Sequence, residues 1–305
     1  MSSCSKIFLI FFFSFFVIFL WWEIYLPVNY FFREEKIFLI KKGESLFQIA
    51  ENLEKEGLIK NKFLFDLYIF IKGAQRKLQA GEYSLTSSES INRIAEKIIS
   101  GYIAKIVVTI PEGWTQKQIE EMIGLKLPGE NLEGFLFPDT YQFPLRVSGE
   151  EVVKKMRDNF DKKLTPDLKK EIQRQGKTIS EIITMASLIE KEVSKNEDKE
   201  LVSGILWKRL KNNIPLQVDA TITYITGKRT TKISKEETQI DSPYNTYKYL
   251  GFPPGPICNP GIDSIKAAIY PKNSEYWYYL STPEGKTIFS KTLEEHNIAK
   301  EKYLR

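Results

Sequence analysis

Residues 179–193 read ISEIITMASLIEKEV, and this stretch carries the clearest structural signal in the chain. Its apolar side chains recur at the spacing of an α-helix, and Ser180 stands where a capping residue is expected. On a helical wheel they form one broad arc, made of Ile182, Ile183, Met185, Ala186, Leu188, Ile189 and Val193. The opposite side would carry Thr184, Ser187 and Lys191. The pattern predicts an amphipathic helix.

Two glutamates, Glu190 and Glu192, fall inside opposite edges of this apolar arc. A carboxyl group held against apolar neighbours has its charged form disfavoured, so its pKa rises and it can serve as a general acid. The alternative is that both side chains are solvated or pair with Lys191, Lys195 or Arg209. Because residues two apart do not share a helix face, at most one of them points into a given cleft.

The composition excludes several kinds of active site. The only histidine is His296, and the two cysteines, Cys4 and Cys258, stand near opposite ends of the chain. Histidine-based metal sites, Ser-His-Asp triads and CxxC redox sites are therefore excluded. The sequence also lacks the glycine-rich motifs that bind dinucleotides or nucleotide phosphates. We expect no metal and no cofactor, and any chemistry must come from carboxylates, hydroxyls and amides.

Size and charge limit the architecture and the partners. A chain of 305 residues, 42% of them hydrophobic, can bury one sizeable core and a smaller satellite domain. The net charge of +5 suits anionic partners such as lipid headgroups or a carboxylate-bearing glycan. It is too small to indicate nucleic acid, and no basic helix or aromatic RNA-binding motif accompanies it, so we expect no nucleic-acid partner.

The N-terminus carries an apolar run, IFLIFFFSFFVIFLWW, at residues 7–22. Residues 24–26 extend it to about 20 residues, the length that spans a bilayer. A cleaved signal peptide is the alternative, but the following WWEIYLPVNYFF offers no small residues for cleavage. We therefore expect residues 1–30 to form a cytoplasmic tip and an uncleaved transmembrane helix. Lys6 favours a cytoplasmic N-terminus, which places the rest of the chain outside the cytoplasm.

Residues 31–102 are expected to form a small α/β subdomain next to the membrane. A strand is expected at 36–40 and another at 81–85, with helices from Ser45 to about Gly57 and from about 61 to 71 between them. A third helix follows at about 90–100. This order is LysM-like, which indicates a glycan-binding module, and a spacer that binds no ligand is the alternative. Residues 103–305, opened by a strand at 103–110, are expected to form a larger α+β domain.

Several motifs occur in a fixed order along the second half of the chain. They are MASLIEKE at 185–192, LQVDAT at 216–221 with Tyr224, SPYNTY at 242–247, GFPPGPI at 251–257, NPG at 259–261, and the late His296-Asn297. Upstream stand PEG at 111–113 and EGFLFPDTY at 133–141. With these motifs the sequence resembles the membrane-anchored endolytic murein lytic transglycosylases (the MltG/YceG-like family). The likeness covers nearly the whole chain. Ala220 and Phe252 stand where the family often has Pro and usually Leu, which affects loop shape rather than polar groups.

The resemblance implies that Glu192 is the catalytic residue. A lytic transglycosylase uses the C6 hydroxyl of its own N-acetylmuramyl substrate as the nucleophile and forms a 1,6-anhydro ring, so one carboxyl group can act as both acid and base. An ordinary glycosidase needs two carboxylates. Glu190 is kept as a secondary candidate because the wheel alone does not separate the two glutamates.

Polar residues within the matching motifs are candidates for binding the sugar. They are Gln217, Asp219, Tyr224, Asn245 and Tyr247. Their alternative roles are turn formation for Asn and Asp, and core packing for Tyr. Residues 253–261 are expected to form a rigid loop along the cleft, and His296 a structural hydrogen bond.

The predicted function is therefore endolytic cleavage of the MurNAc–GlcNAc β-1,4 bond within peptidoglycan strands. The resemblance implies a single-pass protein of the inner membrane, with a periplasmic catalytic domain and with cell-wall synthases (penicillin-binding proteins) as partners. Two alternatives stay open. One is a hydrolytic muramidase with Asp219 as its second carboxylate, and the other is a non-catalytic glycan-binding scaffold for those synthases.

Overall fold

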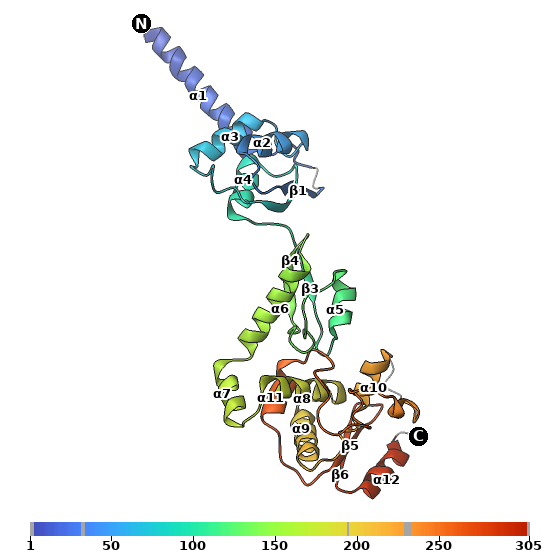
Figure 1. Ribbon diagram of the computed structural model, residues 1–305. Coiled ribbons are helices and arrows are strands. Elements are labelled where there is room, and N and C mark those ends of the chain that lie inside the picture. The colour runs from blue at the N-terminus through green and yellow to red at the C-terminus, as the bar shows by residue number, and fades with distance from the viewer. Residues whose placement is uncertain (1–2, 32–33, 194, 229–232, 304–305) are drawn as a thin grey trace. The chain divides into compact units, whose positions relative to one another are not determined.

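The structure is a computed structural model that describes residues 3–31, 34–193, 195–228 and 233–303, with side chains from Phe12 onward. Contacts divide the chain into two compact units (Figure 1). Unit 1 comprises Met1–Ile106 with Gln142–Arg146, and unit 2 comprises Val107–Tyr141 with Val147–Arg305.

Unit 1 contains the elements that the sequence predicts for its folded part. They are α1 (Ser3–Tyr25), β1 (Lys36–Ile40), α2 (Leu46–Lys55), α3 (Lys62–Ile71), β2 (Gly81–Leu85) and α4 (Ile91–Ser100). β1 and β2 pair antiparallel, with Phe38 opposite Tyr83. Ser45 caps α2 as the sequence predicts, and the structure adds that Gln48 completes a capping box with it. The core beneath this sheet is apolar and includes the fully buried Phe65 and Tyr83.

α1 is a single helix whose last turns belong to this unit, because Ile24 is buried in the unit's core. Trp21 and Tyr25 stack on each other with ring centroids 5.5 Å apart. Among the residues described here, however, no helix combines the length and the apolar character that a bilayer crossing requires. The expected transmembrane helix is thus not supported by the described helices, and the LysM-like assignment stays a prediction.

Unit 2 is predominantly helical. Its elements are β3 (Lys105–Thr109), α5 (Gln116–Ile123), β4 (Thr140–Pro144), α6 (Gly149–Lys163), α7 (Pro166–Arg174), α8 (Ile179–Glu192), α9 (Asn196–Lys211), α10 (Asp219–Thr226), η1 (Glu237–Gln239), α11 (Ile262–Ile269), β5 (Tyr278–Ser281), β6 (Thr287–Ser290) and α12 (Leu293–Tyr303). The unit boundary runs through both β3 and β4, which pair as a two-stranded sheet. β5 and β6 form an antiparallel hairpin. Helices together with small sheets confirm the predicted α+β class.

α8 lies at the centre of unit 2, where it packs against α7, α9, α10 and α11 (Figure 1). The predicted helix is confirmed, but two details differ. Its N-cap is Thr178, which forms a capping box with Glu181, so the cap is not Ser180. Thr184 and Ser187 are also buried, although the wheel placed them on the side away from the apolar arc. Neighbouring helices and the loop that carries Ile257 bury every residue from Ile182 to Ile189, which a single-helix pattern does not reveal.

Candidate functional site

Glu192 is the last residue of α8, and the chain leaves the helix at once because Val193 is extended with φ −141°. The carboxylate accepts hydrogen bonds from the Tyr279 hydroxyl of β5 and from the backbone N–H of Ala220 in α10. Loss of hydration raises the pKa of Glu192 to about 7, and the nearby Asp219 carboxylate adds to this rise. At neutral pH this carboxyl group can therefore both donate and accept a proton.

Arg209 forms hydrogen bonds with two of the backbone segments near Glu192. It projects from α9, is 6% exposed, and its Nε donates to the Trp277 carbonyl at 3.0 Å. Its Nη1 donates to the Leu216 carbonyl at 2.9 Å, and its guanidinium lies 5.1 Å from the Tyr278 ring. Arg209 also favours the charged form of Glu192 electrostatically. One buried cation thus fixes both the β5 hairpin and the loop before α10.

Asp219 and Tyr247 form the second polar pair of the site. Asp219 is the first residue of α10, and the Tyr247 hydroxyl donates a hydrogen bond to it. Burial raises the pKa of the Asp219 carboxyl, and the hydrogen bond from Tyr247 partly offsets this. Because Asp219 also acts on the pKa of Glu192, the structure brings Glu192, Asp219 and Tyr247 together.

Gln217 lies just before this pair in an unusual backbone conformation. Its φ of 53° falls in the left-handed region, which non-glycine residues seldom occupy. The backbone is held there because its N–H donates to the Thr246 carbonyl at 3.1 Å, while the side chain is exposed. Such strain is maintained by surrounding contacts and clusters at functional sites.

Asn245, the fourth candidate for sugar binding, does not face solvent. It is fully buried, and its Nδ2 donates to the carbonyls of Thr238 and Ile240 at 3.0 and 2.8 Å. Its Oδ1 accepts from the Tyr247 N–H at 2.9 Å. The amide therefore shapes the loop that presents Tyr247, and this is the turn role that the sequence left open as the alternative.

Glu190 is directed away from Glu192, toward the N-terminus of α11. Its Oε2 accepts from the Ser264 hydroxyl at 2.6 Å and from the Gly261 N–H at 3.1 Å. Lys199 lies 3.5 Å from the same oxygen, and both charged side chains are at least nine-tenths buried. Glu190 thus joins α8, α9 and α11, and neither Lys191 nor Lys195 is its ionic partner.

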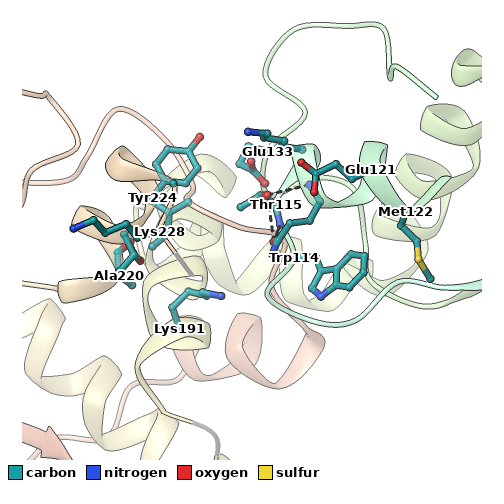
Figure 2. A pocket seen from close by; sticks show the side chains of 14 residues that line it. Trp114, Thr115, Glu121, Met122, Glu133, Lys191, Ala220, Tyr224 and Lys228 are labelled. Carbon is teal, nitrogen blue, oxygen red and sulfur yellow. Dashed lines mark hydrogen bonds between the residues drawn. The ribbon is translucent and has the colours of Figure 1, made fainter. Parts of the chain in front are cut away.

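A cavity of about 920 Å³ opens beside these residues in unit 2 (Figure 2). Tyr224 and Lys228 lie on one side, Trp114 and Glu133 on the other, and Lys191 points toward the space between them. Ala220, whose N–H binds Glu192, is also part of the lining, although Glu192 itself is not. Tyr224 therefore belongs to this cavity and not to the Glu192 cluster.

Glu133 is a buried carboxyl group that the sequence signalled only through the EGFLFPDTY motif. It accepts hydrogen bonds from the N–H of Gln116, at the start of α5, and from Asn259 Nδ2 at 3.0 Å. Burial raises the pKa of Glu133 to about 7. The Asn259 amide also forms hydrogen bonds with the Trp114 carbonyl and the Leu136 N–H, so these contacts hold the end of the predicted 253–261 loop against the segments before it.

This raised pKa predicts a pH-dependent contribution to stability. The folded-state pKa lies above the unfolded value, so the contribution is fully present below about pH 4.5 and is lost as pH rises through 7. The unsubstituted protein should lose free energy of unfolding between pH 4.5 and 8, whereas Glu133→Gln has no carboxyl group to ionise. The free energy of unfolding of Glu133→Gln should therefore rise by about 2–3 kcal/mol relative to the unsubstituted protein over this range, since one pKa unit is worth about 1.4 kcal/mol. Urea unfolding of both proteins at the two pH values measures this difference in free energy. A stability difference that does not change with pH would contradict the assignment.

His296 and Cys258 are structural in this fold. His296 stacks on Tyr278, and burial lowers its pKa to about 4, so it is neutral at physiological pH. Its buried Nδ1 has no hydrogen-bond partner among the described residues, which differs from the expected structural hydrogen bond. Cys258 is a buried free thiol against the Ser187 carbonyl. Within the described residues, no cluster of His, Cys, Asp and Glu is arranged to hold a metal ion.

Two residues that contact Glu192, namely Tyr279 and Ala220, could not be identified as site residues from the sequence. Tyr279 stands far along the chain from Glu192, inside the run Trp277–Leu280 that resembles an ordinary strand. The Ala220 N–H is a backbone group without a side-chain signature. Only the alternation of β5, which turns Tyr279 toward α8, places it beside the carboxyl group.

Comparison with known proteins supports one assignment. Residues 38–302 match the model of the YceG-like family. A Bacillus subtilis protein named endolytic murein transglycosylase is 34% identical, over 87% of this chain and 84% of its own length. A Streptococcus pneumoniae protein of the same name is 31% identical over 85% of this chain, which spans 56% of that longer protein.

A solved structure agrees with these sequence matches. The crystal structure of a YceG-like protein from Listeria monocytogenes superimposes with a TM-score of 0.59 at 32% identity. The match covers 88% of this chain and 99% of the crystallised one. From the family match over most of its length and from these relatives, the chain belongs to the YceG-like family.

Proposed function

We propose that this protein cleaves the glycan strands of peptidoglycan with Glu192 as its catalytic residue. The observation that carries the proposal is the environment of Glu192. Its pKa is raised to about 7 while the Tyr279 hydroxyl and the Ala220 N–H hold it in place. The relatives named endolytic murein transglycosylases support the same reaction class.

The proposed reaction needs one carboxyl group in two consecutive roles. Protonated Glu192 donates its proton to the glycosidic oxygen of the MurNAc–GlcNAc β-1,4 bond, and the bond to MurNAc C1 breaks. The resulting carboxylate accepts the proton of the C6 hydroxyl as that oxygen bonds to C1. The products are a GlcNAc 4-hydroxyl and a 1,6-anhydro-MurNAc end. Water is not consumed, and Glu192 regains its proton.

The candidate binding residues take different places in this proposal. Asp219 and Tyr247 lie beside the carboxyl group and would hold the sugars next to the scissile bond, and the exposed side chain of Gln217, two residues before Asp219, would assist them. Tyr224 would contact the substrate from the neighbouring cavity. Asn245 would act indirectly by positioning Tyr247.

A hydrolytic muramidase is the second candidate, because Asp219 lies close enough to Glu192 to raise its pKa. In that reaction Asp219 would activate a water molecule or stabilise the glycosyl cation. The hydrogen bond that Asp219 accepts from Tyr247 leaves its carboxylate available for either role.

The product separates the two reactions. We expect glycan strands incubated with the protein in H₂¹⁸O to yield 1,6-anhydro-MurNAc ends without ¹⁸O, because the nucleophile is the substrate's own C6 hydroxyl. Mass spectrometry of the released fragments measures this. Reducing ends that carry ¹⁸O would establish the muramidase reaction instead.

We propose further that the chain acts outside the cytoplasm, anchored in the inner membrane by residues 7–26, where cell-wall synthases would be its partners. The apolar run of the sequence supports this. We expect protease added to intact spheroplasts to digest the chain beyond about residue 30 while a short N-terminal fragment stays with the membrane. Complete protection of the chain beyond residue 30, with digestion only after lysis, would refute the orientation.

A further inference from the structure

The cavity of Figure 2 adjoins the catalytic carboxyl group without including it. Ala220 links the two, since its N–H binds Glu192 while the residue lines the cavity. Lys191, next to Glu192 in the chain, points into the same space. A volume of about 920 Å³ lies within the range of sites that bind small organic ligands. The cavity can therefore hold a part of the substrate near the scissile bond.

The lining of the cavity is charged rather than simply polar. Lys117, Lys191 and Lys228 supply cations, and Glu121 and Glu133 supply carboxyl groups. Lys228 is ion-paired with Glu237, outside the lining. Among the described residues Lys191 has no ion-pair partner, and its Nζ only donates to the Gly113 carbonyl at 3.3 Å. An exposed, unpaired cation in a cavity that adjoins the catalytic carboxyl group is free to bind an anionic group of a ligand.

The chemistry of the substrate identifies that group. Peptidoglycan strands are neutral along their sugars, because the amino groups are acetylated and the lactyl group of MurNAc is joined to peptide through an amide. Carboxylates and a free amino group occur only on the peptide stem. A cavity that combines cations with carboxyl groups matches such a peptide better than it matches a neutral sugar.

We infer that this cavity binds the peptide stem of the muramyl residue next to the cleaved bond, with Lys191 holding a stem carboxylate. The inference rests on the proposed function, because it assigns a second part of the same substrate. Trp114 and Tyr224, on opposite sides of the cavity, supply flat surfaces for the apolar parts of the stem (Figure 2). Strands with intact stems are then the preferred substrate.

The test compares two forms of one substrate with the full-length protein. Uncrosslinked strands with intact stems are assayed beside the same strands whose stem carboxyls have been converted to neutral amides. We expect kcat/KM to fall about tenfold on amidation, mainly through KM, the size expected for one charge-assisted hydrogen bond. Lys191→Met should lose this preference, and Lys191→Arg should keep most of it.

A matched control is Lys266→Met, which removes an exposed lysine of unit 2 that does not line the cavity. It should leave both substrates unaffected. Equal kcat/KM for the two substrates in the unsubstituted protein would overturn the inference. So would a Lys191→Met protein that keeps the preference, or one that slows equally on both substrates, since Lys191 would then act on the reacting groups.

A binding measurement separates this inference from the proposed function. Labelled intact and amidated strands are titrated with the Glu192→Gln protein, and anisotropy reports the two Kd values. A tenfold weaker Kd for amidated strands that disappears in Glu192→Gln/Lys191→Met supports the stem site even where no strand is cut. Equal Kd values for both strands refute it, whatever the reaction proves to be.

Discussion

Replacing Glu192 with Gln should lower the cleavage rate by about 10²–10⁴-fold, the usual loss when a general acid is removed. The amide is nearly isosteric, and its oxygen can still accept a hydrogen bond from the Tyr279 hydroxyl or the Ala220 N–H. It has no proton of suitable acidity to give to the glycosidic oxygen. We therefore expect turnover to disappear while the fold and strand binding are retained.

The measurement is release of soluble fragments from glycan strands, with a thermal melt of each protein. The control is Glu197→Gln, which changes an exposed glutamate at the start of α9 and should have little effect. An active Glu192→Gln protein would remove Glu192 from the mechanism. A protein that loses cleavage but keeps its effect in the cell would instead favour the non-catalytic scaffold.

Replacing Glu190 with Gln should mainly lower stability, by about 3–5 kcal/mol. Removing one partner of a buried ion pair leaves the other charge uncompensated, and Lys199 is only 5% exposed. The amide could still accept from Ser264 and Gly261, so α11 should stay in place in the molecules that fold. Cleavage per folded molecule should then change less than in Glu192→Gln.

A double substitution makes this second expectation specific. In Glu190→Gln/Lys199→Met the unpaired charge is absent, so most of the lost stability should return. Urea unfolding of the single and double variants gives the comparison. If Glu190→Gln is as stable as the unsubstituted protein and inactive, the two glutamates have exchanged the roles assigned to them here.

Local elements of this protein were predictable because they depend on neighbouring residues. The capping residue Ser45 and the apolar spacing of residues 179–193 predict their helices to within one or two turns, and the structure confirms both helices. The strand at 36–40 has the predicted bounds. The histidine and cysteine content of the sequence also excluded histidine-based metal sites, Ser-His-Asp triads and CxxC redox sites, and this required no knowledge of the fold.

The burial of individual side chains and their hydrogen-bond partners could not be predicted in the same way. The helical wheel treated Ser187 as solvent-facing, yet Ser187 is buried and accepts a hydrogen bond from the Ile257 N–H. Asn245 has the residue type of a sugar ligand, but the loop around it occupies its amide. Both outcomes depend on segments distant in the sequence.

The sequence by itself therefore determined the central helix, its two glutamates and the family motifs that select Glu192. Only the tertiary structure decided what each glutamate contacts. Residues two apart on a helix point in different directions, so Glu190 meets Lys199 and the start of α11, while Glu192 meets Tyr279 and the Ala220 N–H. The physical reason is that hydration and partner charges set a carboxyl group's pKa, and both are supplied by helices and strands that the local pattern does not contain.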